Sequence, residues 1–142
     1  MTHLLHVDSS AFSAGSVSKE IAETFRTSWD ATHPQGVVTH RDLGLNPVPA
    51  IVEAAVTATF TPAEQHTAEQ AAASAFRETL VQEVLDADAY LFTVPMYNWG
   101  IPATFKAWLD QIIQGGRTLA FDGNPPLGEG RISHAPSLEG SG

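Results

Sequence analysis

The sequence predicts a single α/β domain in which helices cover both faces of a doubly wound parallel sheet, giving three layers. Two observations carry this prediction. Short apolar runs alternate with longer segments of helical periodicity, in the order strand, helix, strand, helix, strand, helix. The run at residues 89–94 is nearly continuously apolar, which is typical of a parallel strand covered on both faces. Such βαβ units connect their strands by right-handed crossovers.

The first half of the chain contains two predicted strands. One is expected at residues 3–7 and the other at residues 36–42. Between them, a loop of small residues leads into a helix that begins at Val17. Val17, Ile21 and Phe25 are spaced by four and give this helix an apolar stripe, which Ala22 and Trp29 widen. After the second strand, Asn46-Pro47-Val48-Pro49 interrupts the pattern, and a separate short helix is expected near residues 51–59.

The second half is expected to begin with a long alanine-rich helix from Thr61 to about Leu85. Thr61-Pro62-Ala63-Glu64 has the form of a capping box with proline at the first helical position. The third strand follows and ends at Pro95. Pro102 fits the start of a last helix, in which apolar residues recur at Phe105, Trp108, Leu109 and Ile112. The acidic residues of the long segment are expected to form a solvated helix face: Glu64, Glu69, Glu78 and Glu83.

Composition limits the classes of function. A chain of 142 residues, 43% hydrophobic and 16% charged, is typical of one globular domain that buries a core. The net charge of −9, with only seven lysines and arginines, argues against nucleic acids or anionic membranes as partners. The absence of cysteine excludes disulfides and thiol catalysis. With no signal peptide or membrane-spanning run, we expect a cytoplasmic protein with a small-molecule ligand.

Two loops that follow predicted strands form the candidate site. The segment Met96-Tyr97-Asn98-Trp99 joins the third strand to a helix, at the sheet edge where open α/β sheets bind ligands, and its aromatic residues suit a flat ring. The loop after the first strand carries serines and ends at a helix amino end, which suits a phosphate: Ser9, Ser10, Ser13, Ser16 and Ser18. Taken alone, these serines are better explained as a helix cap and a solvated loop.

The pattern of the serine loop also bears on the class of nucleotide. It has neither the GxGxxG nor the GxxxxGK[ST] spacing, so a mononucleotide is favoured over a dinucleotide or a nucleoside triphosphate. No metal site is predicted. His3 and His6 flank a strand without a carboxylate cluster, which favours ordinary edge histidines, and the other histidines are scattered.

Together, three stretches of the sequence resemble the FMN-dependent NADH:quinone oxidoreductases that also act as azoreductases, a family with a flavodoxin-like fold. The stretches are Asp8-Ser9-Ser10 with Ser16-Val17-Ser18, Arg41-Asp42-Leu43 with Asn46-Pro47-Val48-Pro49, and residues 95–102 with Phe105-Lys106 and Leu109-Asp110. The family has Met-Tyr-Asn and an aromatic residue at the positions of residues 96–99. The similarity extends from the first strand to about Gly128.

The resemblance implies FMN as the cofactor, NADH as the electron donor, and quinones or aromatic azo compounds as acceptors in a ping-pong reaction. Four residues would bind the FMN phosphate: Ser10, Ser16, Val17 through its backbone N–H, and Ser18. Four others would surround the isoalloxazine ring: Met96, Tyr97, Asn98 and Trp99. Because the cofactor performs the electron transfer, no catalytic side chain is expected. Members of the family are homodimers, so the resemblance also implies a homodimer.

The carboxyl-terminal part departs from this family. Residues 122–142 are rich in proline and glycine, and no run of four apolar residues follows Phe121. In the family's strand order 2-1-3-4-5, strands 4 and 5 are then missing. We therefore expect an incomplete flavodoxin-like FMN-binding domain at residues 1–128 and a disordered or irregular tail at residues 129–142. The uncovered third strand predicts self-association, and the missing contacts predict weaker FMN binding than in intact relatives.

Two functions remain open from the sequence. The first is the flavoenzyme. The second is a catalytically inactive, truncated remnant of the same fold that binds an anion or a protein partner. A signalling domain of the response-regulator type fits less well, because serines rather than an acidic pair follow the first strand.

Overall fold

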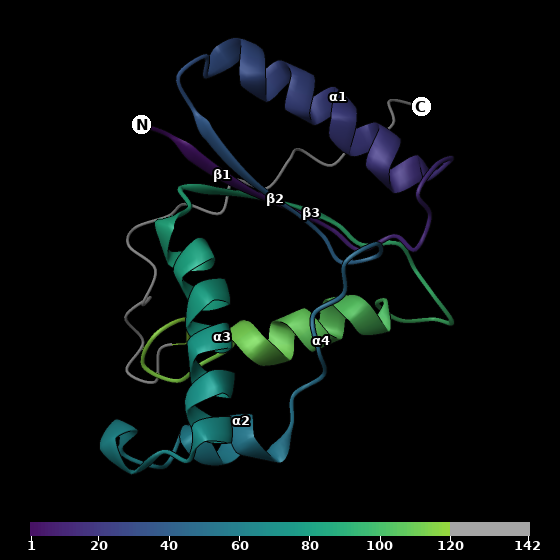
Figure 1. Cartoon of the computed structure of the whole chain (residues 1–142). Coiled ribbons are helices and arrows are strands. Elements are labelled where there is room, and N and C mark those ends of the chain that lie inside the picture. The colour runs from purple at the N-terminus through teal and green to yellow at the C-terminus, as the bar shows by residue number, and fades with distance from the viewer. Residues whose placement is uncertain (120–142) are drawn as a thin grey trace.

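A parallel sheet lies between two helical layers in the computed structural model, which describes residues 1–119 (Figure 1). The strands are β1 (His3–Asp8), β2 (Val37–Asp42) and β3 (Ala89–Thr93), in the order β2-β1-β3. Helix α1 (Val17–Thr32) covers one face. On the other side of the sheet lie α3 (Ala68–Asp86) and α4 (Ala103–Ile112), and α2 (Glu53–Ala58) packs against α3 at the end away from the sheet. The doubly wound, three-layer arrangement is confirmed for this part of the chain, and the tail predicted at residues 129–142 lies outside it.

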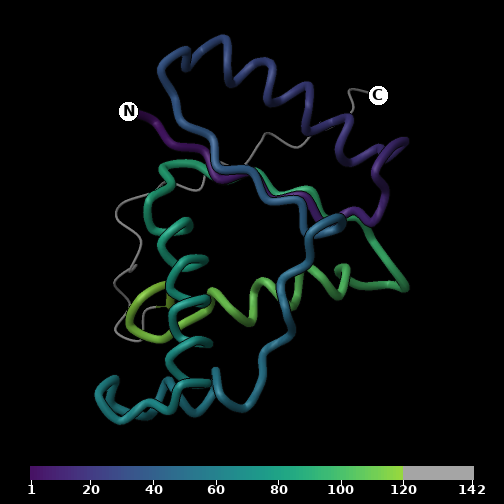
Figure 2. Tube along the Cα trace, viewed as in Figure 1, coloured from purple at the N-terminus to yellow at the C-terminus, as the bar shows by residue number. Residues whose placement is uncertain are grey.

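The strand register brings the carboxyl ends of all three strands level. Asp8 of β1 pairs with Asp42 of β2 and with Thr93 of β3, all in parallel ladders. The loops that follow β1 and β3 therefore leave the sheet at the same edge, as Figure 2 shows. This edge is where the sequence predicts a ligand site.

The main hydrophobic core lies between the sheet and the layer of α3 and α4. Alternate residues of β1 point to opposite faces, so Leu5 and Val7 enter this core while His6 and Asp8 face α1. The core also takes side chains from α3 and α4: Leu80, Val84, Phe105, Trp108 and Ile112. Burying each such large side chain contributes roughly 1.5–3 kcal/mol. No helix in residues 1–119 is long and apolar enough to cross a membrane.

A buried arginine joins the helices of this layer. Arg77 of α3 is 7% exposed, and its guanidinium donates to the carbonyl oxygens of Ala55 and Gln111 at 3.3 and 3.1 Å and to Thr59 Oγ1 at 3.1 Å. It forms no ion pair with any residue that the structure describes. Burial lowers its pKa. Arg77 thus adds guanidinium donors to backbone carbonyls of α2 and of the end of α4.

The side of helix α1 that packs against the sheet is not the side that carries its regular apolar stripe. Ala22 is buried and Trp29 is half-buried, but Val17, Ile21 and Phe25 are exposed. The reason is the polar surface of the sheet beneath α1, where His6 and Asp8 of β1 lie. The residues of α1 that contact that surface are Ala22, which is small, and Arg26, which lies beside His6. No row of large apolar side chains from α1 packs there.

The expected start of the long helix is wrong by several residues. Thr61 follows the end of α2 and donates its hydroxyl to the carbonyl of Thr57 in that helix instead of capping a new helix. Residues Ala63–Gln65 form only a 3-10 turn. Helix α3 begins after Thr67, whose side chain accepts from Gln70 N at 3.2 Å, while the Gln70 side chain accepts from Thr67 N at 2.9 Å. The capping box is therefore Thr67 with Gln70.

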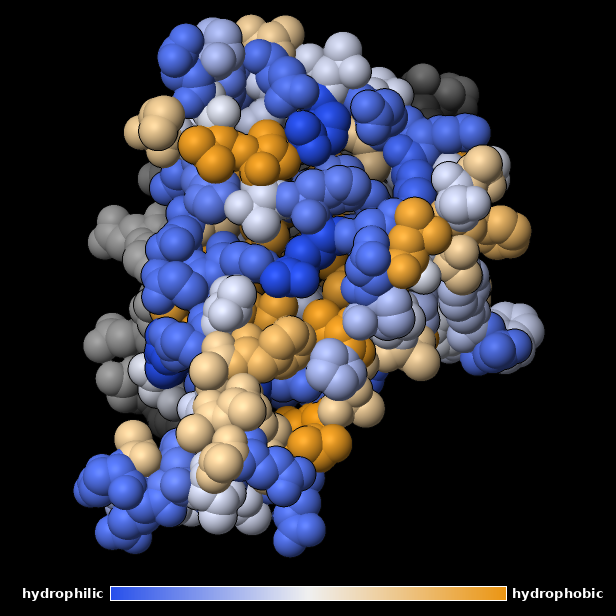
Figure 3. Space-filling view, in the orientation of Figure 1, coloured by the Kyte–Doolittle hydropathy of each residue, from blue (hydrophilic) through white to orange (hydrophobic). Residues whose placement is uncertain are grey.

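Two other expectations concern solvent exposure. Glu64, Glu69 and Glu78 are exposed, as expected for a solvated face, although Glu78 pairs with Arg117 and the half-buried Glu83 pairs with Arg41 of β2. Tyr90 and Phe92 of β3 are each more than a third exposed, although Phe92 packs against Phe105 and Trp108 of α4, because β3 is an edge strand within residues 1–119. Figure 3 shows that the hydrophobic surface on this side of the molecule forms separate patches between hydrophilic residues.

Candidate functional site

Hydrogen bonds hold the two predicted site loops together at the carboxyl edge of the sheet. Ser9 donates to the carbonyl of Thr93 through both its backbone N–H and its hydroxyl, at 3.1 and 2.7 Å. Farther out, the backbone N–H of Ala11 donates to Tyr97 Oη at 3.0 Å. This N–H, then the Ser10 hydroxyl and the charge of Lys19, lower the pKa of Tyr97.

The serine loop ends at the amino terminus of α1. Ser16 is the N-cap residue, and its hydroxyl lies 3.4 Å from Lys19 N and 3.2 Å from Ser18 Oγ. Ser10 is buried and accepts from Phe12 N at 3.3 Å. The N–H groups of a helix's first turn, here those of Val17 and Ser18, lack intrahelical partners and can bind an anion. The loop therefore offers neutral hydroxyl and N–H donors to a phosphate.

The turn after β2 packs against the backbone at the start of the serine loop. Asp42 accepts from the backbone N–H groups of Gly44 and Leu45, both at 3.1 Å, and Leu43 N donates to the carbonyl of Asp8 at 2.8 Å. A Cβ atom on Gly44 would lie 1.7 Å from the carbonyl oxygen of Ser10. Only glycine lets these two backbone segments approach so closely.

Lys19 is a site residue that the sequence analysis missed. Its Nζ donates to the carbonyl of Phe12 at 2.8 Å and to Asp42 at 2.7 Å, so it joins the serine loop to the end of β2. Its position in the first turn of α1 was a signal, because a side chain there reaches back toward the loop. The resemblance of Arg41-Asp42 to the family sequence did not indicate that Asp42 pairs with Lys19.

The aromatic loop forms a tight turn with an unusual backbone. Tyr97 and Gly100 exchange two hydrogen bonds, at 2.9 and 3.1 Å, across Asn98 and Trp99. Asn98 and Trp99 have φ angles of +50° and +66°. Positive φ at both central residues is the type I′ geometry, which asparagine adopts readily and a bulky residue such as tryptophan adopts only at a cost. Trp99 is nevertheless 95% exposed, and Met96 is also exposed.

The structure thus places all eight predicted site residues at one sheet edge, on the two loops and in the first turn of α1. Ser10 and Ser16 are buried, Ser18 and Tyr97 are half-buried, and the other four are exposed. The donors at the start of α1 suit an anionic group. The exposed apolar surface of Met96 and Trp99 suits a flat aromatic ring.

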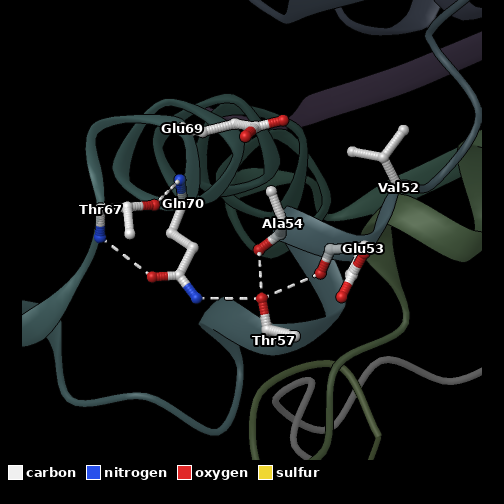
Figure 4. A pocket seen from close by; sticks show the side chains of 7 residues that line it. All are labelled: Val52, Glu53, Ala54, Thr57, Thr67, Glu69 and Gln70. Atoms are coloured by element: carbon white, nitrogen blue, oxygen red, sulfur yellow. Dashed lines mark hydrogen bonds between the residues drawn. The ribbon is translucent and has the colours of Figure 1, made fainter.

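A hollow of about 300 Å³ lies elsewhere, between α2 and the start of α3 (Figure 4). Gln70 crosses its floor and donates to Thr57 Oγ1 at 2.9 Å. Its charged lining residues, Glu53 and Glu69, are carboxylates, and none of the predicted site residues lines it. We assign this hollow to the packing of the two helices and not to the candidate site.

Comparison with known proteins points to the same family. The family model described as a flavodoxin-like fold matches residues 2–134. Proteins named FMN-dependent NADH:quinone oxidoreductase are similar: that of Frankia casuarinae is 53% identical over 119 residues, which cover 84% of this chain and 56% of the relative. That of Streptomyces avermitilis is 53% identical over 129 residues, covering 90% of this chain and 59% of the relative.

A third relative of the same name, from Xanthobacter autotrophicus, is 40% identical over 144 residues, covering all of this chain and 69% of the relative. Among solved structures, the azoreductase of Bacillus anthracis superposes with a TM-score of 0.76 at 29% identity, covering 83% of this chain and 58% of that one. The chain spans less than two thirds of the length of the Frankia and Streptomyces relatives. The chain belongs to the flavodoxin-like family of FMN-dependent NADH:quinone oxidoreductases.

Proposed function

We propose that this chain carries the FMN-binding part of an NADH:quinone oxidoreductase that also reduces aromatic azo compounds, and that it acts in the cytoplasm. The observation that supports this most directly is the contact between Tyr97 Oη and Ala11 N. This contact joins the serine loop, which suits a phosphate, to the aromatic loop, which suits a flat ring, at the carboxyl edge of a parallel sheet. The names of the relatives supply the cofactor and the electron donor.

In this proposal the serine loop binds the FMN phosphate through Ser10, Ser16, Ser18 and the N–H of Val17. The positive end of the α1 dipole adds to the attraction. The aromatic loop holds the ring with Met96, Tyr97, Asn98 and Trp99. When bound, FMN supplies the two-electron chemistry that connects NADH to the acceptor.

The side chains of this chain bind and orient rather than react. Tyr97 anchors the ring loop to Ala11, and Asn98 presents its amide and backbone groups at a fixed turn. Trp99 shields the apolar surface of the bound flavin ring from water. No residue among these is a catalytic acid, base or nucleophile in the proposal.

The same proposal includes a homodimer or self-association through copies of this chain. Strand β3 pairs only with β1 within residues 1–119, so its outer edge has backbone groups available for another strand. Quinones and azo compounds are the proposed acceptors, and neither nucleic acids nor membranes are proposed partners.

A titration of FMN with the purified chain, followed by flavin fluorescence, tests the site. We expect saturable quenching that Ser16→Asp/Ser18→Asp abolishes, because two carboxylates would repel the phosphate dianion at the start of α1. The matched control is Thr24→Asp/Ser28→Asp, which adds the same charge on an exposed side of α1 and should leave quenching intact.

Turnover then separates the two functions that the sequence left open. If the chain with bound FMN consumes NADH in the presence of a quinone, it is the proposed oxidoreductase. If it binds FMN but consumes no NADH, the inactive remnant is the correct assignment. Loss of quenching in the control variant as well would refute the phosphate assignment.

A further inference from the structure

A polar cluster under α1 is separate from the proposed flavin residues and is built by strand register. His6 of β1 and His40 of β2 are direct neighbours in the parallel ladder. Asp8 lies two residues after His6 on the same face of β1. The register therefore places two imidazoles and one carboxylate side by side on rigid strands. The sequence pattern did not indicate this cluster, because His40 becomes a neighbour of His6 and Asp8 only through the strand register.

The ligand atoms of these residues converge. His6 Nε2 lies 3.0 Å from Asp8 Oδ1, and His40 Nε2 lies 2.7 Å from Asp8 Oδ2. One ligand atom from each of the three residues lies within 4.8 Å of the others. The two rings stack with centroids 4.4 Å apart. Since zinc binds nitrogen and oxygen at about 2.0–2.2 Å, only a small adjustment brings these atoms around one ion.

The Asp8 carboxylate is buried, and hydrogen bonds hold it in place and keep it ionised. His6 and Asp8 are 3% and 4% exposed, while the His40 side chain is 47% exposed and gives an ion a route of entry. Thr93 Oγ1 donates to Asp8 Oδ1 at 2.5 Å and can support the carboxylate from outside the ligand set. Burial alone would raise the pKa of Asp8, but hydrogen bonds from His6, Thr93 and His40 outweigh it and lower the pKa below its ordinary value.

We propose that His6, Asp8 and His40 bind a divalent late transition metal ion of the zinc type. Two imidazoles and one carboxylate on one side of an ion are a recurrent biological ligand set, and they leave positions for water. Imidazole favours zinc, cobalt, nickel or copper over magnesium and calcium. The site lies on the face of the sheet toward α1, and none of its three residues is among the proposed flavin-binding residues.

Arg26 of α1 sets how strongly the site binds. Its Nη1 lies 3.4 Å from His6 Nδ1, which favours a proton on Nε2, the nitrogen that an ion needs. Metal binding requires the proton on Nδ1 and requires Arg26 to turn away. Asp30, already 3.7 Å from Arg26 Nη2, can receive the guanidinium. A residue that accepts the Nδ1 proton should therefore strengthen binding.

The test is a titration of the full, untagged chain with Co²⁺, followed by its visible d–d absorption, and then displacement by Zn²⁺. We expect one saturable equivalent. His40→Val should weaken binding by more than the roughly 10- to 100-fold that loss of a supporting partner costs. Valine suits an exposed strand position, so the variant should fold. Arg26→Gln should strengthen binding roughly ten-fold, because the glutamine oxygen can accept from Nδ1.

His3→Asn is the matched control, because His3 lies on the same strand but contacts Thr39 instead of the cluster. It should leave the affinity unchanged. Ring ¹⁵N NMR adds a readout that does not depend on the variants: Zn²⁺ should shift Nε2 of His6 and of His40. Absence of saturable binding, equal affinity in His40→Val, or an unshifted Nε2 of either histidine would overturn the proposal.

Discussion

Trp99 has an unfavourable positive φ angle, and its side chain is almost completely exposed. An exposed side chain contributes little packing energy to offset the backbone energy, so we expect Trp99 to have a binding role. We expect Trp99→Gly to weaken FMN binding while leaving the free energy of unfolding undiminished. Relief of about 1–2 kcal/mol of left-handed backbone energy offsets the roughly 0.5–1 kcal/mol that glycine costs through chain entropy. Urea denaturation and flavin quenching measure the two effects. A clear loss of stability would show that Trp99 packs against the protein instead.

The two tyrosines of the chain should ionise at separate pH values. The Ala11 N–H, Ser10 and Lys19 lower the pKa of Tyr97, whereas burial and then the charge of Asp88 raise that of Tyr90. Ultraviolet absorption should show two steps on either side of the ordinary value near 10, with Tyr97→Phe removing the lower step. A single step of double amplitude would contradict the contact with Ala11.

The signs for stability follow from the same shifts. The contribution of Tyr90 is complete below the ordinary pKa and is lost as the pH rises through its raised folded value. The contribution of Tyr97 is complete above the ordinary pKa and is lost as the pH falls through its lowered folded value. Tyr90→Phe should therefore flatten the alkaline decline of the unfolding free energy, which denaturation at several alkaline pH values measures.

Individual residues were predictable where their type alone restricts their role. Serines before a helix and an aromatic-amide turn indicated both site loops. Lys19 and Gly44 were not identified, because their roles depend on backbone atoms of Phe12 and Ser10 that become neighbours only in the fold. The positive φ of Trp99 was also beyond pattern analysis, since tryptophan has no preference for that region.

Among the elements, Arg77 connects three helices through carbonyl contacts. Arg77→Met keeps much of the buried volume but removes the guanidinium hydrogen bonds to carbonyl oxygens of α2 and α4. We expect it to lower the unfolding free energy by about 2–3 kcal/mol in urea denaturation. Arg117→Met removes an exposed pair with Glu78 and should cost less than about 1 kcal/mol. Equal costs would mean that the contacts of Arg77 contribute little.

The elements themselves were largely predictable, because periodicity and proline positions mark them. All three strands, α2 and α4 lie within a residue or a few of their expected places. The start of α3 was missed because two Thr-based capping signals occur six residues apart, at Thr61 and Thr67, and only contact with α2 decides between them. The packed side of α1 depends on the polar sheet surface, which strand register creates.

At the scale of the whole molecule, the edge of β3 that has no neighbouring strand within residues 1–119 has a consequence for assembly. We expect the chain to form dimers or larger species at micromolar concentration by light scattering, through strand pairing at β3. Val94→Lys places a charge at an exposed position directly after the last residue of β3 and should shift the protein toward monomer. Val37→Lys, at the opposite edge on β2, is the control and should not. A monomeric parent chain would refute this expectation.

The central position of β1 also affects how the chain can fold during synthesis. The strand made first obtains its second neighbour only when β3 leaves the ribosome, since Ser9 bonds to Thr93 across 84 positions. Until then β1 can pair with β2 alone, and the apolar side chains of Leu5 and Val7 wait for α3 and α4. Nascent chains of this protein therefore expose a half-paired sheet with an uncovered apolar face between the synthesis of β2 and that of β3, which favours their binding by chaperones.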